Sequence, residues 1–212
     1  MVSVQILFLV LVMAFSVSLY ADLLKEGLAA YNSSNYSKAI YLWDEACNDG
    51  DLNACYNLAY MYATGKGVHY NEKKAAKLYT LGCDSGDLQA CSNLGTLYEN
   101  GTGGIKRDYY KSSRLYAKAY NGGNLDGCFN LAVTYYKGRG VNRDYKIAGE
   151  LYQEACDKGH IRGCYNLAQM YRNGKGFYED KSKAKALYAK ACKMGSGDAC
   201  SKYARLDDEG VR

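Results

Sequence analysis

The sequence CYNLAYMYATGKGV at residues 55–68 recurs along the chain, and this recurrence indicates the fold. Three further copies are CSNLGTLYENGTGGI from Cys91, CFNLAVTYYKGRGV from Cys128 and CYNLAQMYRNGKGF from Cys164. Their starting cysteines are 36, 37 and 36 residues apart. An internal repeat of this length is typical of an array in which each unit packs only against its neighbours.

Each repeat is predicted to form two amphipathic helices joined by a glycine-containing loop. The first helix ends where a glycine can adopt the left-handed cap conformation, at Gly65, Gly101, Gly138 and Gly174. The second helix begins after a side chain that caps helix N-termini well, at Asn71, Asp108, Asp144 and Asp180. The chain contains no proline, which agrees with helices throughout. We therefore predict an all-α fold, an α-solenoid of disulfide-bridged helical hairpins.

The predicted organisation has four parts. Residues 1–21 are uncharged after Met1 and apolar at their centre, which is typical of a signal peptide cleaved after Ala21. An uncleaved membrane anchor is the alternative, and polar residues within the run disfavour it. An N-terminal helical hairpin is predicted at 22–49 and a C-terminal capping helix with a tail at 196–212. Four repeats lie between them, at 50–86, 87–123, 124–159 and 160–195.

Eight of the nine cysteines form pairs with a spacing of eight residues: Cys47–Cys55, Cys83–Cys91, Cys156–Cys164 and Cys192–Cys200. Within one continuous helix this spacing spans about 12 Å, too far for a disulfide. Turn sequences such as NDGDLNA and DKGHIRG separate the partners, so each pair can join a second helix to the next first helix. The chain-entropy estimate for such a loop is roughly 2.5 kcal/mol per bridge. With no CxxC motif, we predict neither a metal site nor a cofactor.

Cys128 stands apart because the residue eight positions before it is Tyr120. Two interpretations are open. Cys128 is either a small buried hydrophobe that has lost its partner, or a thiol that is reactive or forms an intermolecular disulfide. We favour the buried hydrophobe.

Composition and charge exclude several classes of protein. The chain has 27 Lys and Arg against 22 Asp and Glu, a net charge of +5 spread along its length. The basic patch of a nucleic-acid-binding protein is therefore missing. Signal peptide and disulfides together predict a secreted or periplasmic protein, without a membrane span after cleavage. We expect it to be a monomer.

The motif NLAxMYxxGxGV, followed by a Lys- and Ala-rich helix with Leu-Tyr, resembles the Sel1-like repeat. With a signal peptide and cysteine pairs, the chain is similar to the secreted Helicobacter-type cysteine-rich proteins. The resemblance covers essentially the whole mature chain, and it implies a disulfide-stapled superhelix that acts as an adaptor for other proteins. Because some relatives are described as β-lactam-binding proteins with slow β-lactamase activity, the resemblance also implies that alternative function. The departures here are Tyr120, the extra glycine in Gly103-Gly104 and a first hairpin without its leading cysteine.

A catalytic serine is weakly indicated. Ser182-Lys-Ala-Lys185 matches the Ser-x-x-Lys pattern that places both side chains on one helix face. The match lies in a Lys-rich helix start, and the Ser-Asp-Asn and Lys-Thr-Gly motifs are missing, so we favour a structural role. His69 and His160 are predicted to be exposed turn residues rather than bases. Whether the chain is an enzyme stays open.

The better functional candidate is a binding surface on the first helices, which line the concave face of such solenoids. An asparagine recurs two residues after the repeat cysteine, at Asn57, Asn93, Asn130 and Asn166. Asn is a poor helix former, so these amides either bind an extended peptide or bond the loop of the neighbouring repeat. Tyr60 and Tyr136 are candidate binding anchors.

Basic residues between the paired glycines form a second ladder: Lys66, Arg139 and Lys175. They are either a positive rim that favours acidic partners or a plain solvated loop. Our leading prediction is an exported scaffold that binds a peptide or protein on its concave face, with disulfides that pre-organise the surface.

Overall fold

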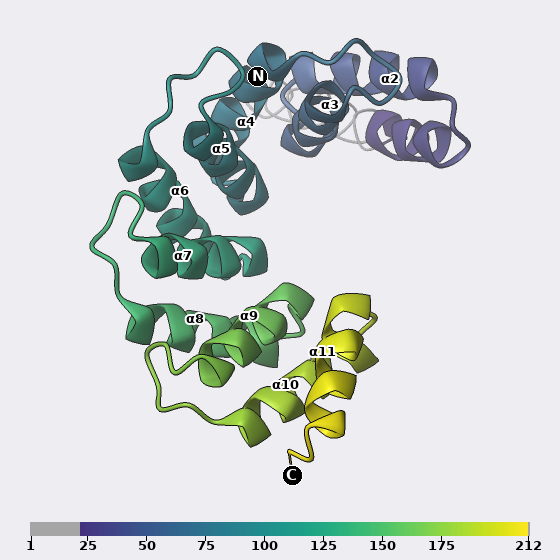
Figure 1. The fold of residues 1–212 in the computed structure, drawn as a ribbon. Coiled ribbons are helices and arrows are strands. Elements are labelled where there is room, and N and C mark those ends of the chain that lie inside the picture. The colour runs from purple at the N-terminus through teal and green to yellow at the C-terminus, as the bar shows by residue number, and fades with distance from the viewer. Residues whose placement is uncertain (1–21, 212) are drawn as a thin grey trace, which may run out of the picture. The chain divides into compact units, whose positions relative to one another are not determined.

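A computed structural model describes residues 22–211, so the predicted signal peptide lies outside the described residues. Between 22 and 211 every regular element is a helix, which confirms the predicted all-α solenoid (Figure 1). A helix at 22–32 is followed by ten more. These are α2 (Tyr36–Asn48), α3 (Leu52–Thr64), α4 (Glu72–Asp84), α5 (Leu88–Asn100), α6 (Tyr109–Asn121), α7 (Leu125–Lys137), α8 (Tyr145–Asp157), α9 (Ile161–Arg172), α10 (Lys181–Lys193) and α11 (Gly197–Asp208).

The chain divides into two compact units. One runs to Ala90 and includes Gly101–Lys106, and the other contains Cys91–Asn100 and the chain from Arg107 onward. In the first unit α2 packs on α3 and α3 on α4, around a core that contains Trp43 and Met61. In the second unit each helix from α6 to α11 packs on the next. Burial of these apolar faces is the main source of stability for helices this short.

Most helices begin and end at the capping residues predicted from the sequence. The second helices α4, α6, α8 and α10 begin after the predicted N-caps, whose side-chain oxygen accepts a hydrogen bond from the backbone N–H three residues on. Gly65 and Gly138 end α3 and α7 in the left-handed conformation, with φ of 68° and 69°. The helix α9 differs, because it ends at Arg172 and is capped by Asn173, one residue before Gly174.

His160 corrects one prediction, because it is not an exposed turn residue. Only 11% of its side chain is exposed. Its Nδ1 accepts the Gly163 N–H at 3.1 Å and so caps the N-terminus of α9. Its ring stacks on Phe129 with 4.4 Å between centroids. His69 is exposed, as predicted.

The second glycine of each loop lies against the start of the second helix in the preceding repeat. A Cβ on Gly140 would lie 2.0 Å from the carbonyl oxygen of Tyr109, the first residue of α6. A Cβ on Gly176 would lie 2.7 Å from the carbonyl oxygen of Tyr145, the first residue of α8. Gly140 also has a φ of 75°, so both the conformation and the space require glycine. Repeats therefore contact each other through backbone at this point.

The disulfides follow the predicted local pairing. Cys47–Cys55, Cys156–Cys164 and Cys192–Cys200 are bonded, with Cα atoms 4.7, 4.5 and 4.6 Å apart. Cys83 and Cys91 are likewise disulfide-bonded. The bridges Cys47–Cys55, Cys156–Cys164 and Cys192–Cys200 join α2 to α3, α8 to α9 and α10 to α11, across the turn between successive repeats.

Cys128 is a free thiol and only 2% exposed, in agreement with the interpretation as a small buried hydrophobe. Its Sγ donates to the carbonyl oxygen of Leu151 at 3.3 Å. Burial raises the pKa of the Cys128 thiol to about 11, so the thiolate is scarce at neutral pH. Tyr120, in the place of the missing partner, donates its hydroxyl to Glu154 Oε2 at 2.8 Å. The residue that replaces the missing cysteine thus bonds α6 to α8, whereas each disulfide joins a second helix to the first helix that follows it.

Candidate functional site

The basic residues between the paired glycines are held by the preceding repeat. Arg139 donates to Glu99 Oε1 at 2.9 Å, and Lys175 donates to the Tyr136 hydroxyl at 3.1 Å. In the first unit, Lys66 donates in the same way to the Tyr31 hydroxyl at 2.8 Å. Neither sequence interpretation of these residues predicted such clamps, which fix each loop to the first helix of the preceding repeat.

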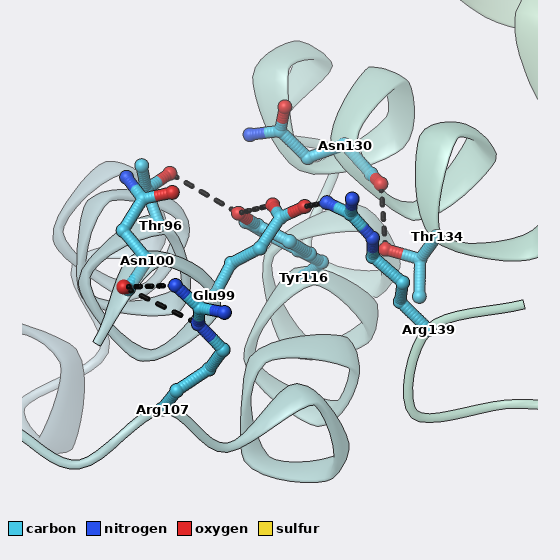
Figure 2. A network of polar contacts seen from close by, with 8 residues as sticks. All are labelled: Thr96, Glu99, Asn100, Arg107, Tyr116, Asn130, Thr134 and Arg139. Atoms are coloured by element: carbon cyan, nitrogen blue, oxygen red, sulfur yellow. Dashed lines mark hydrogen bonds and ion pairs between the residues drawn. The ribbon is translucent and has the colours of Figure 1, made fainter. Parts of the chain in front are cut away.

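Figure 2 shows how one clamp is anchored. The Glu99 carboxylate accepts the Tyr116 hydroxyl at 3.0 Å on one oxygen and Arg139 on the other. Thr96 supports the same Tyr116 hydroxyl at 3.1 Å. Tyr116 is 1% exposed, and this burial raises its pKa, so it remains a neutral donor. The end of α5 and the loop after α7 are therefore joined through Glu99.

A groove of about 570 Å³ opens beside this network in the second unit. Its walls come mainly from one face of α7 and one face of α9, with the start of α11 at one end. The spacing of these residues by three or four positions places them on a common helix face. The lining residues are Glu99, Phe129, Asn130, Val133, Tyr136, Lys137, Tyr152, Arg162, Tyr165, Asn166, Gln169, Ser196 and Asp198.

The structure brings three of the predicted binding residues together in this groove: Asn130, Asn166 and Tyr136. Asn57 and Tyr60 lie on α3 in the first unit, where Tyr60 is 41% exposed. Asn93 lies on α5 and does not line the groove. The predicted asparagine ladder is therefore represented in the groove by two of its four members.

Both groove asparagines also bond within the protein. Asn130 Nδ2 donates to Ser92 Oγ of the preceding repeat at 3.2 Å. Burial raises the pKa of Tyr152 under the groove, and a hydrogen bond with Asn166 partly offsets this rise. An amide has two donors and an accepting oxygen, so each Asn retains capacity for a second partner beyond these bonds.

The contacts of Phe129, which lines the groove, were not predicted from the sequence. The Phe129 ring stacks on the His160 ring, and the guanidinium carbon of Arg162 lies over the Phe129 ring, 4.4 Å from its centroid. The repeat pattern could have indicated these residues. Phe129 directly precedes the repeated asparagine, and Arg162 lies four residues before Asn166, on the same face of α9. The contact with Phe129 holds the exposed positive charge of Arg162 at the groove.

The Ser-x-x-Lys pair lies elsewhere, on α10. Ser182 is exposed in the first turn of that helix. Lys185 forms an ion pair with Asp207 at 2.7 Å and donates to the carbonyl oxygen of Val211. Lys185 therefore ties α10 to the C-terminal segment. Among residues 22–211, no cluster of His, Cys, Asp or Glu is placed to hold a metal ion, and no helix is long and apolar enough to span a bilayer.

Comparison with protein families gives one match. The model of the Sel1 repeat matches residues 19–51, 52–87, 88–124, 125–160 and 161–196. It therefore includes the first hairpin, which lacks the leading cysteine, as a further repeat. The comparison with curated proteins yields no match.

Solved structures with the same repeat are similar to the chain. A Sel1 repeat protein from Oxalobacter formigenes is 26% identical, with a TM-score of 0.80 over 86% of this chain and 74% of the other. A protective antigen of uropathogenic Escherichia coli is also 26% identical, with a TM-score of 0.79 over 91% of this chain. The chain spans only 42% of that antigen. Cysteine-rich protein B of Helicobacter pylori is 26% identical over 62% of this chain and 94% of its own, with a TM-score of 0.49.

Proposed function

Because the chain belongs to the Sel1 repeat family, we propose that it is an exported scaffold that binds an extended segment of a protein partner. The binding site is the groove over α7, α9 and α11. The observation that carries this proposal is the combination, in one groove of about 570 Å³, of amide side chains, aromatic rings and exposed charges. Disulfides persist in oxidising compartments, which supports a location in the periplasm or the medium.

The lining chemistry suits a peptide backbone. The amides of Asn130, Asn166 and Gln169 offer donors and acceptors that match peptide N–H and C=O groups. Tyr136 and Tyr165 lie beside them and supply contact area with few rotatable bonds. An extended segment would therefore be held by its main chain, and its side chains would pack on the tyrosines.

The charges of the groove favour an acidic segment. Glu99 is neutralised by its ion pair with Arg139. Lys137 on α7 and Arg162 on α9 are exposed at the rim, whereas Asp198 lies at the α11 end. Acidic side chains of the partner over α7 and α9 would be attracted there, more strongly at low salt.

The scaffold is also fixed before binding. Disulfides join α8 to α9 and α10 to α11, and the clamp from Lys175 to Tyr136 joins the loop after α9 to the end of α7. A groove with walls held in this way loses little conformational entropy on binding, so more of the contact energy appears as affinity.

A random peptide library displayed on phage and selected against the oxidised exported protein tests this proposal. We expect enriched peptides to bind in calorimetry, and Tyr165→Ala and Gln169→Ala to weaken them by about tenfold, the loss of one interface anchor. Tyr178→Ala is the matched control, since Tyr178 is 97% exposed and lies outside the groove. Enriched peptides that bind the groove variants as tightly as the wild type would contradict the proposal.

A further inference from the structure

A cation replaces the acceptor of the clamp in the last repeat. Glu99, Tyr136 and Arg172 occupy the same position, the eighth residue after the repeat cysteine. Glu99 accepts Arg139, and Tyr136 accepts Lys175. Arg172 is partly exposed in the last turn of α9, and it takes part in no ion pair among the described residues. The last repeat therefore carries a guanidinium without a carboxylate partner, where the two preceding repeats carry the acceptor of a cation.

A buried hydroxyl without a hydrogen bond lies beside this arginine. Tyr188 of α10 is fully buried, and its hydroxyl makes no hydrogen bond within the described part of the chain. Burial raises the pKa of Tyr188, so the hydroxyl stays protonated, and the nearby Arg172 partly offsets that rise. Nearly all buried polar groups in proteins are hydrogen-bonded, because a buried donor without an acceptor is costly. The Tyr188 hydroxyl is therefore a donor that lacks an acceptor.

The equivalent tyrosine two repeats earlier shows which group is missing. Tyr116 of α6 and Tyr188 of α10 hold the same position in the repeat, and both are almost completely buried. The Tyr116 hydroxyl donates to the Glu99 carboxylate, which also accepts Arg139 (Figure 2). A tyrosine hydroxyl and a guanidinium thus share one carboxylate there. In the last repeat the hydroxyl and a guanidinium are both present, but no carboxylate from residues 22–211 joins them.

These two residues border the groove. Tyr165 lines the groove and packs edge-to-face on Tyr188, with 5.5 Å between the ring centroids. Gln169 also lines the groove, three residues before Arg172 and so on the same face of α9. Its amide has two further donors for an anionic ligand. A segment that lies in the groove can therefore extend a side chain to Arg172.

We propose that Arg172 and Tyr188 form a carboxylate-binding site, which receives an acidic side chain of the partner segment. One carboxylate oxygen accepts the Tyr188 hydroxyl and the other accepts the Arg172 guanidinium, the arrangement found around Glu99. Hydrogen bonds in which the acceptor is ionised are stronger than those between neutral groups, and a guanidinium matches the geometry of a carboxylate. The inference rests on the proposed function for the source of the side chain, but not for the existence of the site.

The experiment is an NMR titration of the oxidised, ¹⁵N-labelled protein with N-acetyl-glutamate N-methylamide. The corresponding glutamine compound is the neutral probe of matched shape. We expect the glutamate probe to shift the Nε–H signal of Arg172 and the amide signals of Gln169 and Arg172, and the glutamine probe to bind at least about threefold more weakly. Equal binding of both probes, or shifts confined to α7 and the start of α9, would overturn the proposal. Failure of the peptide selection together with binding of the glutamate probe at Arg172 would contradict the groove proposal and support the carboxylate site.

Two variants locate the contact. Tyr188→Phe removes only the hydroxyl and should weaken the glutamate probe about threefold. Its melting temperature should not fall, because the hydroxyl has no hydrogen bond to lose in the free protein. Arg172→Gln should weaken the same probe about fivefold. Arg114→Gln, an equal loss of charge at an exposed arginine of α6 outside the groove, is the control and should have no effect. Unchanged affinity of the glutamate probe in either Tyr188→Phe or Arg172→Gln would rule the site out.

Discussion

The α6–α7 and α8–α9 turns have the same backbone conformation, although only one of them is crossed by a disulfide. Gly123 and Gly159 have φ of 90° and 91°. The Asn124 N–H donates to the Ala119 carbonyl at 2.9 Å, and the His160 N–H donates to the Ala155 carbonyl at 2.8 Å. The second turn is crossed by a disulfide, whereas Cys128 after the first is free. The glycine, the backbone hydrogen bond and the N-cap therefore set the turn, and the disulfide adds stability to a geometry already present.

The same comparison shows how the repeat without a disulfide is held. Tyr120 reaches Glu154 in the next repeat, and a neutral–charged hydrogen bond of this kind is worth about 1.5 kcal/mol or more when buried and less where water competes. Close packing contributes as well, since a Cβ on Gly127 would lie 2.6 Å from the Ala119 Cβ. Without a covalent bridge, this junction depends on contacts between repeats.

The largest loss of stability is expected from a substitution at the contact between the third repeat, which has the free Cys128, and the repeat before it. Gly140→Ala places a methyl group against the Tyr109 backbone and should lower the free energy of unfolding by about 3 kcal/mol. Gly123→Ala, at a similar positive φ but with open space around it, should cost about 1 kcal/mol. Urea unfolding measures both. Equal losses would mean that conformation, and not contact between repeats, governs the site.

Removal of one disulfide should lower the free energy of unfolding slightly less than Gly140→Ala does. The double variant Cys156→Ala and Cys164→Ala should lose about 2.5 kcal/mol, as the chain-entropy estimate gives for this loop. Cys128→Ala should lose about 1 kcal/mol, since it removes one buried atom and its hydrogen bond. Chemical denaturation of the oxidised proteins gives both values. If Cys128→Ala lost as much stability as the double variant, Cys128 would have a role beyond that of a small buried hydrophobe.

Addition of a disulfide at the α6–α7 turn should raise the free energy of unfolding. Because the two turns have the same backbone conformation, Tyr120→Cys should form a disulfide with Cys128 without loss of helix content. The net gain should be about 1.5 kcal/mol, the bridge minus the lost Tyr120 hydrogen bond. Thiol titration and thermal unfolding measure the outcome, with Tyr120→Cys in a Cys128→Ala background as the control. Free thiols in the oxidised protein would show that the junction is more open than the structure indicates.

The smallest effect concerns the Tyr120 hydroxyl. Tyr120→Phe should cost about 1 kcal/mol at neutral pH. The pKa of Glu154 is lowered in the folded protein by Lys158 and by Tyr120, so its contribution is present above the pKa of an unfolded Glu, about 4.3, and is lost on acidification. The difference between variant and wild type should therefore shrink as the pH falls from 7 towards 3. A difference independent of pH would exclude the carboxylate as the partner.

Local features of the fold were predictable from the sequence. Side chains such as Asp144 specify a helix start within a few residues of chain, and a cysteine spacing of eight across a glycine turn leaves little choice of partner. His160 was misjudged because an imidazole is an uncommon N-cap, and nothing local indicates that Phe129 stacks on it.

Contacts between repeats were not predictable in the same way. The bond from Arg139 to Glu99 joins residues 40 apart, and its existence depends on which helix faces meet. The contact of Phe177 with Gly149 of α8 is likewise visible only once the loop between α9 and α10 is seen to lie on that helix. For the groove, the repeat pattern treated the four asparagines as equivalent, but packing decided that two of them, Asn130 and Asn166, line it.

Packing between repeats sets the turn geometry on which the groove depends, and the disulfides add stability to that geometry. Native-state amide exchange of the double variant Cys156→Ala and Cys164→Ala tests it most directly. If this is right, the His160 amide of the variant stays protected and exchanges only with global unfolding, and we expect the same of the Asn124 amide in the wild type, whose turn has no disulfide. Exchange of His160 near the rate of an unfolded chain, while the amides of α8 and α9 remain protected, would contradict it.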